Sequence, residues 1–335
     1  MSIAPLATES LDAHDSLIET APMASQTNLS PISSVNADSL TAKPLRRLRK
    51  ATTEGERPSV LSQAIATGLV AVAAIYFLLP VVWLIIASTK SLGDLFTTPG
   101  FAFAEMNLFS NIARLTAFEG GIFWRWMFNS LIYSGLGSFL TMLVCALCGY
   151  GLAVYEFRGK KILLGAIAAS LLVPGTVLAQ PIFILLANMG LTNTYFGVIA
   201  PAMVYPFGVM LGYITAKGAI PIQVIEAARI DGAGELRIFF SVAWRMMGTG
   251  LTTIMLFAFV GSWNNFFLPM MVLNDPQMFP VTLGLHQWNQ MVAGIPELNS
   301  LTIIGALLSV IPIAGVFITL QRYWRSGLAA GGVKL

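Results

Sequence analysis

Two cysteines, Cys145 and Cys148, have the spacing C-x-x-C, which occurs in metal sites and in thiol–disulfide enzymes. In both kinds of site the reactive thiolates are stabilised by a metal ion or by nearby positive charge. The surrounding stretch, residues 129–154, contains no Asp, Glu, Lys, Arg or His. A spacing of i, i+3 in such an apolar stretch favours small side chains that pack between helices. We therefore predict neither a metal site nor a redox centre here.

Other signatures of enzyme chemistry are sparse. The two histidines, His14 and His286, belong to no H-E-x-x-H motif, and no G-x-x-x-x-G-K-[ST] phosphate loop occurs in the chain. We predict a protein that is not an enzyme, has no ATPase site of its own and binds no cofactor itself. The net charge of +3 is too small to indicate a nucleic-acid partner.

The composition indicates a membrane protein. Of 335 residues, 56% are hydrophobic and only 10% are charged, whereas soluble domains are about 25% charged. Six apolar stretches without ionisable side chains are long enough to cross a bilayer, which takes roughly 20 residues. They are residues 62–88, 129–154, 162–187, 195–215, 250–273 and 300–321. The fold class predicted is an all-α polytopic membrane protein with six transmembrane helices.

The basic residues predict the orientation of these helices. If the N-terminus is cytoplasmic, 16 of the 19 Lys and Arg residues lie on the cytoplasmic side. The excess of positive charge on that side predicts that both termini are cytoplasmic, in a multi-pass protein of a prokaryotic cell membrane.

Three regions follow along the chain. Residues 1–58 are an acidic arm, rich in Ser and Thr, that ends in a basic cluster; we expect it to be disordered because it has little apolar surface to bury. Residues 59–325 form the six-span membrane domain, including a long cytoplasmic loop at 216–249. Residues 326–335 form a glycine-rich cytoplasmic tail.

The loop at 216–249 predicts a short helix. Pro221 suits the first position of a helix, and apolar residues follow at helical spacing. Asp231-Gly232 then predicts a turn. Without further information, such a helix would be interpreted as one that lies on the lipid surface.

The sequence Glu226-Ala227-Ala228, followed after three residues by Gly232, resembles the E-A-A-x-x-x-G signature of permease subunits in binding-protein-dependent ABC importers. The resemblance implies the MetI-like permease fold and a coupling helix that binds in a cleft of an ATPase subunit. The implied ATPase-coupling residues are Glu226, Ala227, Ala228, Asp231 and Gly232. The family pattern continues with I-x-L-P, where Trp244 and Arg245 replace the leucine and the proline.

Two further segments are similar to sugar-importer permeases. The residues from Trp263 to Phe266 resemble their W-N-x-F segment, and the ending 327–334 is similar to the tail of the shorter maltose-type subunit. That tail reaches between two ATPases, which implies ATPase contacts for Gly331, Gly332 and Lys334. The candidate residues of a substrate path are Trp263, Asn264, Asn265, Gln180 and Tyr150. The alternative for these polar groups is hydrogen bonding between helices.

The predicted function is that of the permease subunit of an ATP-driven importer, with a sugar or an oligosaccharide as substrate. The implied partners are a second permease, two ATPases that bind ATP and Mg, an extracytoplasmic solute-binding protein and the lipid bilayer. The alternative is a self-contained carrier or channel driven by a gradient. The absence of ionisable residues from all six stretches weakens that alternative, because such residues usually carry the coupling charge.

Overall fold

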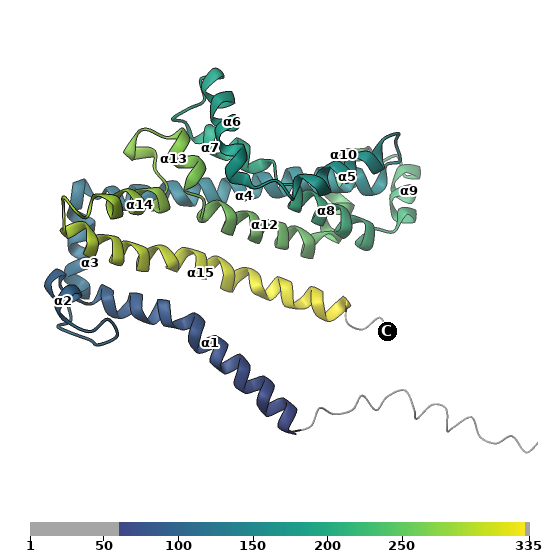
Figure 1. Cartoon of the computed structure of the whole chain (residues 1–335). Coiled ribbons are helices and arrows are strands. Elements are labelled where there is room, and N and C mark those ends of the chain that lie inside the picture. The colour runs from purple at the N-terminus through teal and green to yellow at the C-terminus, as the bar shows by residue number, and fades with distance from the viewer. Residues whose placement is uncertain (1–59, 332–335) are drawn as a thin grey trace, which may run out of the picture. The chain divides into compact units, whose positions relative to one another are not determined.

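The computed structural model describes the backbone of residues 60–331 and the side chains of residues 61–321. The predicted arm, together with Gly332 and Lys334, lies outside the described residues. The chain divides into two units, Met1–Thr67 and Gly68–Leu335. The described part of the first unit is the beginning of helix α1 (Val60–Ser88), and the second unit contains the rest of α1 and the other elements, which Figure 1 labels.

All regular elements in the described part are helical, which confirms the predicted all-α class. After α1 they are α2 (Leu92–Thr97), α3 (Leu108–Ala117), η3 (Phe118–Gly120), α4 (Ile122–Val154), α5 (Lys160–Ser170), α6 (Gly175–Asn188), α7 (Tyr195–Met203), α8 (Pro206–Ala219), α9 (Ile222–Ile230), α10 (Glu235–Ile238), the π-helical η4 (Phe239–Ala243), α11 (Trp244–Met246), α12 (Gly248–Trp263), α13 (Phe267–Val272), η5 (Pro276–Met278), α14 (Val281–Met291) and α15 (Glu297–Gly331). The first residues of the predicted tail, 326–331, are thus the last turns of α15.

In the part of the chain that the structure describes, three helices are long and apolar enough to cross a membrane, within residues 61–88, 122–154 and 297–321. Three bent pairs bring the candidate spans to at most six: α5 with α6, bent by 105°, α7 with α8, bent by 45°, and the segment Glu235–Met246 with α12, bent by 84°.

The predicted stretches 162–187, 195–215 and 250–273 are each interrupted by a break in the helix. Pro174 and Pro206 stand at the first two breaks, because proline disfavours helical backbone in the residue before it. The stretch 250–273 leaves the helix at Asn264–Phe266 and resumes as α13.

Helix α4 is the centre of the second unit and packs most extensively against α8 and α12. One apolar cluster joins the beginning of α4 to α14, α15 and the end of α12. A second cluster joins the end of α4 to α8, α9 and the segment 235–247. Figure 1 shows α3 and α14 near one end of α4 and α9 and α10 near the other. The predicted loop therefore lies at the end of the unit opposite α14.

Glycines allow α4 and α8 to approach closely. A Cβ atom on Gly149 would lie 2.4 Å from the carbonyl carbon of Gly212 and 2.5 Å from the backbone nitrogen of Tyr213. Backbone atoms in a packed helix cannot yield as a flexible side chain does, so even one methyl group would push the two helices apart.

Gly149→Ala is therefore expected to destabilise the protein by about 1–3 kcal/mol, as overpacking does. Gly151→Ala is the matched control, because a Cβ at Gly151 would meet no atom within 4 Å. The control is expected to be neutral or to stabilise by up to about 1 kcal/mol through helix propensity. Thermal unfolding in detergent compares the two variants, and equal midpoints would contradict the close contact.

Candidate functional site

Helix α9 is the predicted loop helix, and both of its ends are defined by backbone geometry. Pro221 is the residue before the helix, with φ −65° and ψ 134°, rather than its first residue as predicted. At the other end, Gly232 has a φ of +77°. The Gly232 N–H donates to the carbonyl of Arg229, and the Ala233 N–H donates to that of Ala228. These two bonds form a Schellman motif, which needs the left-handed conformation that glycine adopts at low cost.

Helix α9 is anchored by one side chain. Ile225 is fully buried in the second apolar cluster, among residues of α8 and of the segment 235–247. The neighbouring residues that carry the E-A-A signature are open: Glu226 and Ala227 are exposed and Ala228 is half-buried. Ile230, at the end of the helix, is 86% exposed. Helix α9 therefore rests on the bundle through Ile225 and presents most of its surface outward.

A polar contact also ties α9 to α4. Arg229 Nε donates to Glu235 Oε1 over 2.7 Å, and the Tyr155 hydroxyl, just after α4, donates to the other carboxylate oxygen. The Arg229 guanidinium also lies 5.7 Å from the centre of the Tyr155 ring. The hydrogen bonds from Arg229 and then Tyr155 lower the pKa of Glu235, so the carboxylate is charged at neutral pH. These three side chains fix the position of α9 relative to the end of α4.

The positions where the sequence departs from the family pattern are helical. Trp244 packs against Phe239 and Phe240, with ring centres 5.9 and 6.1 Å away. Arg245 is exposed and lies in α11. A proline at position 245 would have no backbone N–H to donate within this helical segment.

A second candidate site lies beside three helix breaks: the one before α6, the one between α7 and α8, and the one between α12 and α13. Its cavity has a volume of about 430 Å³, within the range of small-ligand pockets. Irregular backbone at membrane depth is tolerated where it is buried or lines a cavity, and in transporters it often marks the binding site. We call this cavity the break pocket. Its lining residues are Gly175, Thr176, Leu178, Ala179 and Ile182 of α6, Pro201, Ala202 and Val204 around the break between α7 and α8, and Asn265, Phe267 and Leu268.

The structure brings only one of the predicted path residues into the break pocket. Asn265 lines the pocket, whereas the Asn264 side chain is exposed and donates back to the Val260 carbonyl of its own helix. Trp263 is 3% exposed and stacks on Phe259 in the first apolar cluster. Gln180 is exposed on α6 and does not line the pocket. Tyr150 is 4% exposed and packs against Phe239, beneath the loop helix.

Other polar residues in the spans were not predicted to have a role. Thr176 of α6 lines the break pocket; it follows Pro174-Gly175, and that pair was the available signal for a break. Asn129 of α4 donates to the carbonyls of Gln277 and Phe279, and Tyr133 donates to that of Met278. These bonds hold the segment that contains η5 against α4.

The side chain of Cys145 packs at the break between α7 and α8. Its Sγ lies 3.5 Å from the Tyr205 carbonyl oxygen, and the Thr141 hydroxyl lies 3.1 Å from that of Ala202. The two side chains thus face carbonyl groups at the break between α7 and α8. A Cβ on Gly208 would lie 2.7 Å from the same sulfur, so the thiol fills the space that this glycine leaves. Over residues 60–331, no group of three or more His, Cys, Asp or Glu could hold a metal ion.

Comparison with known proteins identifies the family. Residues 145–328 match the family described as "Binding-protein-dependent transport system inner membrane component". The arabinooligosaccharides transport system permease protein AraQ of Halalkalibacterium halodurans is 35% identical over 64% of this chain and 76% of its own. The diacetylchitobiose uptake system permease protein NgcG of Streptomyces coelicolor is 30% identical over 80% and 88%.

A solved structure supports the fold. A chain of a bacterial ABC transporter involved in the import of the acidic polysaccharide alginate superposes with a TM-score of 0.69, covering 80% of this chain and 98% of that one. At 20% identity this similarity concerns the fold, which is that of an ABC importer permease. The family resemblance predicted from Glu226-Ala227-Ala228 and Gly232 is thereby confirmed, and the chain belongs to the inner-membrane components of binding-protein-dependent transport systems.

Proposed function

We propose that this chain is the permease subunit of an ATP-driven importer, and that α9 is the helix through which separate ATPase subunits drive it. The observation that carries the proposal is the exposure of α9. The helix is fixed at Ile225 and through Arg229, yet Glu226 and Ala227 remain open. Small side chains let a partner surface approach closely, and Glu226 supplies a charge for pairing. A second permease and an extracytoplasmic solute-binding protein complete the proposed complex, with both termini of this chain in the cytoplasm.

The contacts of α9 suggest how movement would reach the membrane helices. Ile225 packs in the same cluster as Ala216 of α8 and Leu251 of α12. Tyr155 links α9 to the end of α4. Displacement of α9 by an ATPase would therefore act on α4, α8 and α12 together. The break pocket lies among α6, α7 and α13, and its opening and closing would follow from that movement.

A sugar or an oligosaccharide is the substrate class that we propose. The relatives named above transport arabinooligosaccharides and diacetylchitobiose, as their names state. The break pocket offers an amide at Asn265, a hydroxyl at Thr176 and an aromatic side chain at Phe267. Such a combination suits the hydroxyl groups and the apolar face of a sugar ring.

Purification and reconstitution test this proposal. Affinity purification of the full chain from its native membrane is expected to recover an ATPase and a second permease. In liposomes, the complex is expected to accumulate sugar only with ATP and the binding protein, and the chain alone is expected to be inactive. Accumulation by the chain alone, driven by an ion gradient, would instead support a self-contained carrier.

A further inference from the structure

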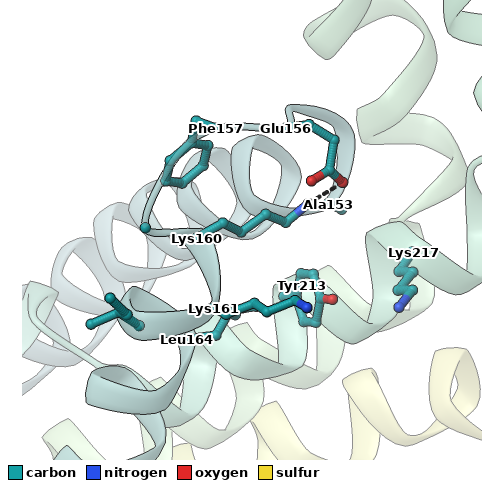
Figure 2. Close-up of a pocket in the computed structure, with 10 residues that line it drawn as sticks. Ala153, Glu156, Phe157, Lys160, Lys161, Leu164, Tyr213 and Lys217 are labelled. Carbon is teal, nitrogen blue, oxygen red and sulfur yellow. Dashed lines mark hydrogen bonds and ion pairs between the residues drawn. The ribbon is translucent and has the colours of Figure 1, made fainter.

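A second cavity, of about 530 Å³, lies at the end of the membrane domain that carries α9. Figure 2 shows this cavity, which we call the lysine pocket. Its walls come from the end of α4 and the following turn, the first turns of α5 and the last turns of α8. The lining residues are Ala153, Glu156, Phe157, Gly159, Lys160, Lys161, Ile162, Leu164, Tyr213 and Lys217.

The charge of the lysine pocket is positive. Three lysines and one glutamate leave a net charge of +2. Glu156 is already paired, because its Oε1 lies 2.8 Å from Lys160 Nζ. This hydrogen bond lowers the pKa of Glu156, with smaller contributions from the charges of Lys217 and Lys161. Figure 2 shows Lys160 extended toward Glu156, with Lys161 and Lys217 near Tyr213.

Two of the three lysines have no carboxylate partner among the described residues. Among the described side chains, neither Lys161 nor Lys217 forms a hydrogen bond or an ion pair. The nearest aromatic contact is that of Lys217, whose Nζ lies 5.7 Å from the centre of the Tyr213 ring. Both side chains are exposed, whereas the Lys160 side chain is only 12% exposed. The positive charges of Lys161 and Lys217 are therefore available to an anion from outside the chain.

We propose that the lysine pocket binds a phosphate group, held by Lys161 and Lys217 above the Lys160–Glu156 pair. Basic pockets between membrane helices are suited to the phosphate of anionic lipid headgroups. Two further features fit such a ligand. The pocket includes Gly159 at the beginning of the eleven-residue helix α5, where the helix dipole is positive. Its wall also includes Ile162, which is 79% exposed and offers apolar surface beside the charges.

The bound phosphate would lie close to α9. Lys217 and Ala153 also line a neighbouring cavity, whose other walls include Ile222 and Ile225 of α9. Lys217 stands three residues before the short connection that leads from α8 to α9. A phosphate group held by Lys217 would thus be bound directly beside the anchor of the loop helix.

Native mass spectrometry of the full chain, purified in detergent with the subunits that accompany it, tests the proposal. The probe is phosphatidylglycerol, compared with phosphatidylcholine. The pocket variant is Lys161→Gln/Lys217→Gln, and the charge-matched control is Arg237→Gln/Arg245→Gln, both exposed and outside the pocket. Each basic residue near the membrane strengthens the binding of an anionic lipid about fivefold. The pocket variant, which lacks two of them, is therefore expected to bind phosphatidylglycerol about 25-fold more weakly. The control is expected to retain it.

A second arm distinguishes the source of the phosphate. The unfolding temperature is measured in neutral detergent with inorganic phosphate, for the wild type and the pocket variant, which also shows whether the variant is folded. A phosphatidylglycerol preference lost only in the pocket variant supports a lipid headgroup. Stabilisation of the wild type alone by inorganic phosphate, without a lipid preference, supports a soluble phosphate ligand. If neither probe separates the pocket variant from the wild type, or if both double variants lose the lipid equally and phosphate has no effect, the proposal is wrong.

Discussion

Gly232→Asp is expected to abolish uptake and the stimulation of ATP hydrolysis, while the protein remains in the membrane. Gly232 has a φ of +77°, and a side chain there costs about 1–2 kcal/mol. A Cβ atom would meet nothing within 4 Å, so no clash adds to this cost. The new carboxylate would follow Asp231 at the negative end of the α9 dipole. These effects are too small to unfold a membrane domain, but they act on the turn that sets the angle of α9.

The control for this variant is the same substitution two residues later. Gly234 has a φ of −70° and is the residue before α10, where aspartate is a favourable cap. Gly234→Asp therefore adds the same charge without strain, and uptake is expected to persist. Gly232→Asn, which tolerates a positive φ without adding charge, is expected to retain part of the activity. The measurements are protein level in the membrane, uptake in vesicles and stimulated ATPase activity. Undiminished uptake by Gly232→Asp would contradict the proposed role of α9.

The loop helix was largely predictable from the sequence because its signals are local. Pro221 and Gly232 act on the backbone of their own neighbourhood, and both ends of α9 lie within one residue of the prediction. The contact of Arg229 with Glu235 and Tyr155 was not predictable in the same way. Tyr155 lies far from Arg229 in the sequence, and only the packing of α4 against the loop brings them together.

The break pocket was only partly predictable, because an apolar stretch has the same composition whether its helix is straight or bent. Pro174 and Pro206 stand at two of the breaks, but Pro181, Pro201 and Pro312 lie inside helices. Proline alone therefore does not identify a break. The break after Trp263, at residues 264–266, contains no glycine or proline itself, and its nearest proline is Pro269 in the first turn of α13. The position of this break also depends on how α12 and α13 pack against other helices, which cannot be read from a single sequence.

The polar residues of the spans show the same limit. Tyr150 and Asn265 were both candidates in the sequence, since each is a polar group in an apolar stretch. The structure places Tyr150 in the cluster under α9 and Asn265 at the break pocket. Trp263, two residues before Asn265 along the chain, is a core residue. Which face of a helix meets a cavity is decided by the neighbouring helices, so only the structure separates these residues.

Asn265→Leu is expected to lower uptake at least about fivefold. Leucine has a similar volume but cannot donate or accept a hydrogen bond, and leaving a substrate group unpaired in an apolar pocket costs about 1–3 kcal/mol. The loss is expected both in uptake and in the stimulation of ATP hydrolysis by substrate, while basal ATP hydrolysis persists. Thr176 of α6 carries the other polar side chain of the pocket, and valine has nearly the same shape without the hydroxyl. Thr176→Val is therefore also expected to lower uptake.

The adjacent asparagine is the matched control. Asn264→Leu changes the same chemical group, but the Asn264 amide donates to the Val260 carbonyl 2.9 Å away and does not line the pocket. Its effect on uptake is expected to be no more than about twofold, since an exposed side-chain hydrogen bond contributes little net stability. Initial uptake rates over a range of sugar concentrations separate binding from transport. If Asn264→Leu and Asn265→Leu impaired uptake equally, the helix break itself would matter and the break pocket would not be the substrate site.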